Sequence, residues 1–418
     1  MRKRLQLNLG LSDERGVTAI IVGILMVVFI GIAAVVIDIG YAMATKNELH
    51  NIADGAALAA TGWLGNNYSN MNTNELVNYV VDGTDEANIK GIATNVAGNN
   101  QAGGVGNIIL NDGDIEIGQW DSSAEADVID DSLRGTLNDP RFTPTLVQPD
   151  AVRVIARREE GVNGPISTFF ARIFGIDDVG VNAIATAALT GIDEVDECEL
   201  FMPVGISESW FDYWNAETGE WCDHDIKMYP TGGIEGCAGW HTFGSWPSND
   251  PKLIALLQNN IQGNCNDGAD TGDEFVYTGG TLGNAFEYME DLFNLMRDCQ
   301  AGSPALQALL LKMQEDDPTL TEADLLLACR DGEGVPKDID TDPDTWTTHV
   351  VIYGGADCSD NPGGYLPIVG FATVEINNVE DVPDKLINAT VKCLGYGDGR
   401  GGGGGEFGTM GTIPGLVQ

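Results

Sequence analysis

An uncharged apolar run near the N-terminus constrains this chain more than any other feature. Residues 17–37, VTAIIVGILMVVFIGIAAVVI, are twenty-one residues without a charge. As a helix rising about 1.5 Å per residue, they span about 31 Å, the thickness of a bilayer's hydrocarbon core. A cleaved secretory signal has a shorter apolar core of about 7 to 15 residues. The length therefore favours a retained transmembrane helix, which we place at residues 17–39.

The charges on either side of this run predict its orientation. Four basic residues precede the run, namely Arg2, Lys3, Arg4 and Arg15. Asp38 stands at its other end. Because cytoplasmic ends of membrane helices collect Lys and Arg, we expect residues 1–16 to be cytoplasmic. The rest of the chain would then lie in the periplasm or beyond.

A one-sided apolar stripe continues past the run. Its members are Tyr41, Ala44, Leu49, Ile52, Ala56 and Ala59, and no proline interrupts them. This helical spacing predicts one long helix that extends through residues 40–63. Such a rod would lift the first folded domain off the bilayer or pack against a similar helix of a partner.

The charge balance excludes one class of partner. The chain has 63 acidic and 21 basic residues, a net charge of −42. A surface this acidic repels other polyanions, so nucleic acid is not expected as a partner. It is also compatible with a saline habitat or with loosely held divalent cations, and the composition does not separate these readings. Hydrophobic residues make up 43%, as in folded globular proteins.

Residues 64–190 contain no cysteine and predict a small α+β domain. Short runs typical of strands recur in this region, at residues 108–110, 115–117, 151–156 and 179–189. Residues 164–174 predict a short helix. Four of its apolar residues are expected to enter the core, namely Phe169, Phe170, Ile173 and Phe174.

Residues 191–396 hold all eight cysteines of the chain. They are Cys198, Cys222, Cys237, Cys265, Cys299, Cys329, Cys358 and Cys393. They follow the predicted span, on the oxidising side of the membrane, and their even number favours four disulfides, although eight cysteines allow 105 pairings. A metal site needs short Cys-x-x-Cys spacings, whereas the closest two cysteines here are fifteen residues apart.

Helical and strand patterns mix within this cysteine-rich region. Helices are predicted at residues 253–261, 281–297, 304–315 and 321–329, and strands at residues 350–353 and 368–376. The strand at 368–376 is apolar enough to lie centrally in a sheet. No strict βαβ repeat appears, so the fold class expected for both exported domains is α+β.

The C-terminal residues 397–418 predict a glycine-rich flexible tail. Residues 399–405 are glycine apart from Arg400, a composition typical of a flexible tether. The last residues, EFGTMGTIPGLVQ, are apolar for a terminus. The alternative is therefore a strand that docks onto the sheet edge of a partner protein.

No catalytic set is recognisable in the sequence, and no cofactor is expected. Gly-x-Ser-x-Gly, His-Glu-x-x-His and P-loop motifs are absent. The string Cys222-Asp223-His224-Asp225, with His241 nearby, resembles a metal site only loosely. A disulfide-bonded cysteine beside exposed polar residues explains it more simply. The sequence therefore predicts a protein that is not an enzyme.

One acidic loop is a weak calcium candidate. Its carboxylates alternate, at Asp338, Asp340, Asp342 and Asp344, as they do in calcium loops. Pro343 replaces the glycine that the sharp turn needs, and His349 stands where a bidentate Glu would come. A solvated acidic loop is the favoured interpretation, and residues 266–274 are a still weaker candidate for the same ion.

Tryptophan is concentrated in one part of the cysteine-rich region. Five of the eight tryptophans lie within forty residues, namely Trp210, Trp214, Trp221, Trp240 and Trp246. Such a cluster either fills the core of a disulfide-bonded domain or forms a sugar-binding face. The core is the favoured interpretation, and the binding face is the alternative.

The sequence around the apolar run resembles a known family. Arg15-Gly16 precede the run, Val36-Ile37-Asp38-Ile39-Gly40 stand at its exit, and residues 51–59 read NIADGAALA. This pattern is similar to the N-terminal segment of the TadE/TadG-like Flp pilus-assembly family. Two later strings, PDAVRV at 149–154 and GPISTFFA at 164–171, also look like parts of TadG-like proteins.

The resemblance implies a role in building or anchoring a tight-adherence (Flp, type IV) pilus at the inner membrane. Some relatives carry a von Willebrand A-like domain with an Asp-x-Ser-x-Ser metal motif; residues 121–125, DSSAE, lack the final Ser, so that domain is not expected. Prepilin-like relatives carry a Glu five residues beyond a cleavage-point Gly, but counted from Gly16 that position is Ile21. A retained anchor is therefore favoured over entry into the filament.

Together these patterns predict a single-pass, non-catalytic inner-membrane protein with exported α+β and disulfide-rich α+β domains. Its expected partners are the inner membrane and other pilus-assembly proteins. The alternative is a surface adhesin or ligand-binding envelope protein that uses the tryptophan-rich region.

Overall fold

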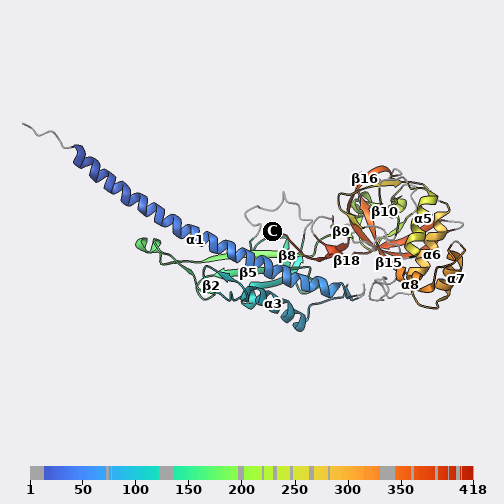
Figure 1. The fold of residues 1–418 in the computed structure, drawn as a ribbon, viewed down its shortest axis with the longest axis horizontal. Helices are drawn as coiled ribbons and strands as arrows, with labels where there is room; N and C mark the ends of the chain where they lie inside the picture. The colour runs from blue at the N-terminus through green and yellow to red at the C-terminus, as the bar shows by residue number, and fades with distance from the viewer. Residues whose placement is uncertain are drawn as a thin grey trace, which may run out of the picture.

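The computed structural model describes most of the chain after the first thirteen residues. The described residues are 14–71, 75–76, 78–121, 136–195, 202–218, 221–228, 233–244, 248–262, 268–280, 283–315, 317–329, 344–358, 362–381, 385–393, 395–401, 405 and 407–417. One long helix, α1, reaches out from a body in two parts (Figure 1). The first part packs along α1, and the second lies at the end of the molecule opposite the free end of the helix.

Helix α1 runs without a break from Glu14 to Tyr68. The predicted continuation of the membrane helix is therefore confirmed, and it ends five residues beyond Trp63. In its second part the helix carries small apolar residues, of which Ala53, Ala56 and Ala57 are fully buried. Alanine both favours the helix and lets it lie close to the sheet beneath.

A five-stranded sheet in the order β20-β8-β5-β3-β4 packs against α1. Its strands are β3 (Ile115–Trp120), β4 (Phe142–Pro144), β5 (Ala151–Arg158), β8 (Val181–Ala188) and β20 (Gly415–Leu416). Alternate residues such as Val152, Val154, Ala185 and Ala187 enter the core under α1, as the two-residue period of a strand requires. The strands predicted at 115–117, 151–156 and 179–189 are confirmed.

A second helix, α3 (Gly83–Gly98), packs beside α1. It begins where the Asp82 carboxylate accepts hydrogen bonds from the backbone N–H groups of Thr84 and Asp85, a standard N-terminal cap. Short elements complete this part of the chain: β1 (Gln101–Ala102), β2 (Val105–Gly106) and the 3-10 helix η1 (Asp112–Asp114).

Two sequence predictions for this part are wrong. Residues 108–110 form no strand, because the side-chain amide of Asn163 hydrogen-bonds both the N–H and the carbonyl oxygen of Ile109. Residues 166–179 form a hairpin of β6 (Ile166–Ser167) and β7 (Asp178–Val179) around a 3-10 helix, η2 (Ala171–Phe174). The four side chains expected in the core are not buried there: Phe169, Phe170, Ile173 and Phe174 are all exposed.

The second part of the body is built on a seven-stranded sheet. Its strands are β10 (Val204–Ser207), β11 (Asp225–Lys227), β12 (Ala238–Trp240), β14 (Glu274–Thr278), β15 (Trp346–Tyr353), β16 (Gly363–Glu380) and β17 (Leu386–Val391). β16 pairs with β14, β15 and β17, and β15 leads back through β10 and β12 to β14. These pairings close a ring. The predicted strands at 350–353 and 368–376, and the central place of the latter, are confirmed.

Among the described residues, five helices belong to this part of the body. They are α4 (Glu208–Thr218), α5 (Asp250–Ile261), α6 (Ala285–Arg297), α7 (Pro304–Met313) and α8 (Glu322–Cys329). α6 is the most deeply placed; Phe286, Met289 and Leu292 are fully buried on the face that meets the sheet. The helices predicted at 253–261, 281–297, 304–315 and 321–329 correspond to α5 through α8, and the expected α+β class is confirmed.

The described residues of the C-terminal segment form strands rather than the predicted flexible tail, and residues 402–404, 406 and 418 lie outside them. β18 (Gly395–Arg400) pairs in parallel with β19 (Thr409–Ile413), and β20 pairs with β8 in the first part of the body. The C-terminus accordingly lies beside β8 (Figure 1). The strand interpretation therefore holds, but the sheet edge belongs to the chain itself and not to a partner.

Three short elements complete the second part of the body. β9 (Glu194–Val195) pairs with β13 (Ala269–Asp270), and the 3-10 helix η3 (Ile234–Gly236) precedes β12. The core under α1 draws on residues 49–189 and Tyr396, whereas the other large core draws on residues 202–391. This division agrees with a boundary near residue 190, which stays a prediction.

Candidate functional site

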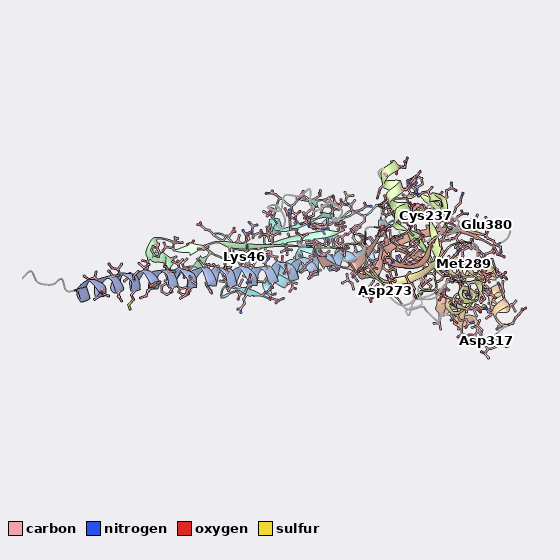
Figure 2. All side chains as sticks on the ribbon, turned by 90° about the horizontal axis from the view of Figure 1, so that it is seen from above. Lys46, Cys237, Asp273, Met289, Asp317 and Glu380 are labelled. Carbon is pink, nitrogen blue, oxygen red and sulfur yellow. A yellow bond between two sulfur atoms is a disulfide. The ribbon has the colours of Figure 1, made fainter. Side chains whose placement is uncertain are left out.

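The first part of α1 is an apolar helix that is largely uncovered. From Ile20 to Ile39 its large apolar side chains are exposed, with Val27 at 71% and Phe29 at 66%. The first turns of α1 project beyond the rest of the molecule (Figure 2), whereas Ala34 further along the helix is buried. Among the described residues, α1 is the one helix long and apolar enough to cross a membrane. This segment is the candidate membrane site.

Asp38 marks the point where α1 meets the folded domain. Its carboxylate accepts hydrogen bonds from three consecutive backbone N–H groups of the hairpin at residues 166–179: Phe169 at 2.8 Å, Phe170 at 2.9 Å and Ala171 at 2.7 Å. Hydrogen bonds to an ionised acceptor are stronger than neutral ones. The charge that ends the apolar run therefore also fixes this hairpin to the helix.

A second set of bonds holds the base of the same hairpin. The Glu48 carboxylate accepts a hydrogen bond from the Gly103 N–H at 2.6 Å. Arg158 is 5% exposed, and its guanidinium donates to the carbonyl oxygens of Ala102 (2.6 Å) and Gly164 (2.7 Å). Helix, β1–β2 turn and hairpin are thereby fixed to one another just beyond the apolar segment.

Further along, α1 is fixed to the sheet and to the C-terminal segment. The Thr61 hydroxyl donates to the Ala187 carbonyl oxygen at 3.1 Å, and the Tyr68 hydroxyl donates to that of Pro149 at 2.6 Å. The Tyr68 ring stacks on Tyr396, with ring centroids 4.5 Å apart. Burial raises the pKa of Tyr68 above its ordinary value, so the phenol stays a neutral donor.

Six of the eight cysteines form disulfides in the described residues. The pairs are Cys222–Cys393, Cys237–Cys358 and Cys299–Cys329. Cys198 and Cys265 lie outside the described residues, so the fourth bridge stays a prediction. All three observed bridges lie after residue 190, in the part of the chain that the sequence predicts to be disulfide-rich.

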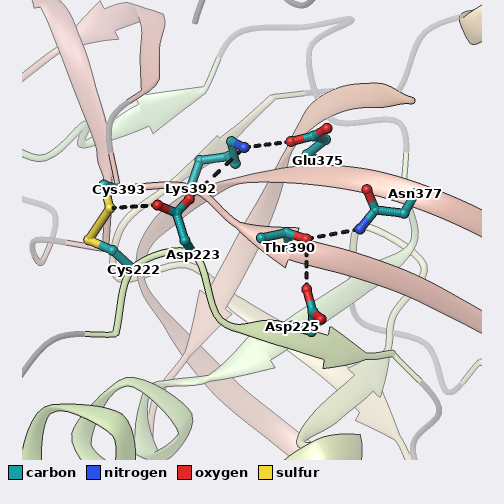
Figure 3. A network of polar contacts seen from close by, with 8 residues as sticks. All are labelled: Cys222, Asp223, Asp225, Glu375, Asn377, Thr390, Lys392 and Cys393. Atoms are coloured by element: carbon teal, nitrogen blue, oxygen red, sulfur yellow. Dashed lines mark hydrogen bonds and ion pairs between the residues drawn. A yellow bond between two sulfur atoms is a disulfide. The ribbon is translucent and has the colours of Figure 1, made fainter. Parts of the chain in front are cut away.

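The string at 222–225 is not a metal site. Cys222 is bonded to Cys393, and the Asp223 and Asp225 carboxylates point toward Lys392 and Thr390 (Figure 3). The same network includes Glu375, which pairs with Lys392 at 2.5 Å, and Asn377, which donates to Thr390 at 2.9 Å. His224 stacks on Trp214, and His241 is fully buried elsewhere. The simpler explanation, a disulfide beside polar residues, is correct.

The calcium candidates receive no support. Asp338, Asp340 and Asp342 lie outside the described residues, and Asp344 stands just before β15. Within the described ranges, no group of three or more His, Cys, Asp or Glu side chains is placed to hold a metal ion. In the weaker candidate at 266–274, Asp273 accepts a hydrogen bond from the Asp270 N–H.

The tryptophan cluster is part of the core. Trp210 and Trp240 are fully buried, and Trp214 and Trp221 are partly buried against the same core. Trp246 lies outside the described residues. The favoured interpretation of this cluster is confirmed for the four tryptophans that the structure places.

The region that holds the membrane helix and the first sheet is matched by two family descriptions. Residues 16–62 match the Tad family, described as Flp pilus-assembly TadE/G-like, and residues 44–187 match Tad_C, described as Tad-like Flp pilus-assembly. Residues 16–187 are therefore similar to the TadE/TadG-like Flp pilus-assembly family. The first match ends within α1, and the second ends at Ala187, one residue before the end of β8.

The TadE/TadG-like region thus contains both the uncovered apolar helix and the bonds at Asp38. No curated protein and no solved structure matches the chain. The sequence predicted the apolar run and used Asp38 for orientation and within the family resemblance, but it did not predict the hydrogen bonds of this carboxylate to the hairpin. The string GPISTFFA at 164–171, which was interpreted as part of a short helix and as part of the resemblance, is the signal that marks this hairpin.

Proposed function

We propose that this TadE/TadG-like protein is a non-catalytic assembly component of a Flp pilus, anchored in the bacterial inner membrane by α1. Residues 1–16 would lie in the cytoplasm, and both folded parts would lie outside that membrane. The observation that carries the proposal is the continuity of α1, in which an uncovered apolar segment runs directly into a segment buried in a folded domain.

This continuity supports a rigid anchor. Between the apolar segment and the sheet, α1 has no break, and it is bonded through Asp38, Glu48, Thr61 and Tyr68. A flexible linker would let the exported domains move freely, whereas a continuous helix transmits the position of the membrane segment to the whole body. A structural assembly factor needs this property more than an enzyme does.

Topology can be tested with alkaline phosphatase, which becomes active only outside the cytoplasm. A fusion after residue 70 is expected to be active, whereas a fusion placed before Met1 is expected to be inactive. As a matched control, changing Arg2, Lys3, Arg4 and Arg15 to Glu should reduce activity at residue 70, because basic residues set the orientation. Activity of the N-terminal fusion in the unaltered chain would contradict the proposed topology.

The role in assembly can be tested by fractionation. An anchored assembly factor is expected in the inner-membrane fraction, and its deletion should abolish surface fibres. Recovery of the protein in sheared fibres would contradict the anchor and favour the adhesin alternative. The adhesin has little support in the structure, since the tryptophans proposed for its binding face lie in or against the core.

A further inference from the structure

The hairpin at residues 166–179, here called the apolar finger, lies beside α1 where the apolar run ends. The three hydrogen bonds from Phe169, Phe170 and Ala171 to Asp38 place the start of its 3-10 turn beside Asp38, the first residue after the uncharged run. Tyr41 on α1 contacts the Phe169 ring edge-on, with centroids 6.0 Å apart. Both views show the finger, drawn in green, alongside α1 (Figures 1 and 2). The finger therefore stands at the level where a bilayer around α1 would begin.

The tip of the finger is apolar and uncovered. Ile173 is 79% exposed, Phe174 63% and Phe169 66%, and Ile176 is also exposed. Large apolar side chains gathered on one exposed projection mark a protein or membrane contact. The prediction that these side chains enter the core fails because the hairpin projects away from the sheet and its core.

The backbone of the tip is suited to a medium poor in water. The N–H groups of Phe169, Phe170 and Ala171 are bonded to Asp38, and those of Ile173, Gly175 and Ile176 are bonded to carbonyl oxygens of residues 170–172 at 3.0 to 3.1 Å. The Thr168 hydroxyl donates to the Ile176 carbonyl oxygen at 2.5 Å. Because an unsatisfied backbone group is costly near lipid, the pairing of these six N–H groups suits an inserted turn.

The charge of the finger also fits a lipid surface. Although the chain carries a net charge of −42, residues 166–176 contain no acidic residue and one basic residue, Arg172, which is exposed. A basic side chain at this depth can extend its guanidinium to lipid phosphates while its stem stays in apolar surroundings. The acidic residues Asp177 and Asp178 follow at the base, on the side away from the tip.

We infer that the apolar finger inserts its tip into the outer leaflet of the membrane that α1 crosses, giving the protein a second membrane contact. This inference rests on the proposed anchoring by α1. The membrane then contacts both α1 and the finger, which Asp38 links to each other. These two contacts fix the tilt and rotation of α1, and hence the direction in which the exported body points. We assign lipid rather than a second protein chain as the partner of the apolar tip, because the tip lies beside the end of the membrane span.

The insertion can be measured on the full chain in lipid vesicles. Three single variants, Ile173→Cys, Ile24→Cys and Leu311→Cys, are labelled without reductant with an environment-sensitive fluorophore, and lipids carrying a nitroxide on the acyl chain serve as quencher. Leu311 is a matched control, since it is 69% exposed on α7 at the opposite end of the molecule. The parent chain, labelled in the same way, gives the background from the native cysteines.

We expect fractional quenching at Ile173 to be at least about two-fold greater than at Leu311, as for an apolar side chain held in the interfacial region. Ile24 should be quenched as well, because it lies within the span. If Ile24 is quenched but Ile173 behaves like Leu311, the contact of the finger is disproved and the anchor stands. If Ile24 is not quenched, the anchor itself is wrong, and the finger inference falls with it.

Discussion

Gly65 is the residue at which the C-terminal segment crosses α1 most closely. A Cβ atom there would overlap the carbonyl group of Thr412 in β19 and would crowd Leu189. Three residues earlier, a Cβ at Gly62 would meet Pro414 only at ordinary contact distance, 3.9 Å. Both glycines lie in the same helix, so they separate the effect of close approach from the effect of helix propensity.

We therefore expect Gly65→Ala to destabilise the protein by about 1 to 3 kcal/mol, because overpacking outweighs the gain in helix propensity. Gly62→Ala should be neutral or stabilising by up to about 1 kcal/mol. Thermal unfolding of the full chain in detergent measures both. Faster trypsin cleavage after Arg400 in Gly65→Ala would show that the C-terminal strands have loosened, whereas equal behaviour of the two variants would contradict the crossing.

Two buried histidines give stability a dependence on pH. Burial lowers the pKa of His241 to about 3 and that of His349 to about 4, from an ordinary 6.5. At pH values between these lowered pKa values and 6.5, the unfolded chain binds protons that the folded chain does not. The histidines therefore leave the free energy of unfolding undiminished above about pH 6.5 and lower it as the pH falls.

His349→Gln tests this dependence, since its ring lies 3.2 Å from the Thr373 hydroxyl, and glutamine can also hydrogen-bond there without titrating. Between pH 6.5 and 5, the parent chain should lose about 2 kcal/mol more unfolding free energy than the variant. Denaturant unfolding at the two pH values gives the difference. Equal losses in parent and variant would mean that His349 is not held neutral by burial.

At the scale of elements, the regular structure was largely predictable and the exceptions have physical reasons. Helices α5 to α8 and strands β3, β5, β8, β15 and β16 follow from apolar periodicity, which reports burial within one segment. The finger has apolar residues without a core, because its surroundings are set by α1. β20 pairs with β8, more than two hundred residues earlier, and no local pattern reports such a partner.

The candidate site was predictable only in part. The apolar run predicted the membrane-spanning part of α1, because twenty-one uncharged residues are a strong local signal. The bonds of Asp38 to the finger join residues more than 130 positions apart. Their pairing depends on the tertiary fold.

Among the disulfides, Cys299–Cys329 links the end of α6 to the end of α8 and encloses α7. Its loop has a sequence separation of 30 residues, for which loop closure predicts a stabilisation of about 3 to 4 kcal/mol. Changing both cysteines to Ser should lower the free energy of unfolding by about that amount in denaturant titrations. Unchanged stability would indicate that the helices are held by packing alone.

The fourth bridge is expected to join Cys198 and Cys265. Cys198 follows β9 by three residues, Cys265 precedes β13 by four, and these strands pair antiparallel with Val195 opposite Ala269. Mapping of unreduced peptides by mass spectrometry should recover this pair with the three observed ones. Alkylation of either cysteine without reductant would contradict it.

At the scale of the whole molecule, the C-terminal segment connects the two parts of the body. Phe407 packs against Phe211 in the second part, with ring centroids 4.8 Å apart, while β20 pairs with β8 in the first. Between them, Met410 bridges to Gly191, close to the boundary of the two cores. The segment therefore contributes to both parts.

Two truncations separate these contributions. Ending the chain at Pro414 removes β20 and should destabilise only the first sheet, because the edge of β8 loses its partner. Ending it at Gly401 also removes Phe407 and β19, and should in addition make the junction near residue 191 sensitive to protease. Limited proteolysis of both truncated proteins and the parent chain in detergent measures the difference. Equal cleavage at the junction would contradict a bridging role.

The pairing of β20 with β8 also sets an order of events during export. If the N-terminus stays in the cytoplasm, residues near 40 leave first and β8 emerges more than two hundred residues before β20. The first sheet then waits, with one edge open, until residues 415–416 have emerged. A product that stops before residue 415 would reach the periplasm with that edge still available to proteases and to other strands, so such copies would be exposed to degradation before they could join an assembly.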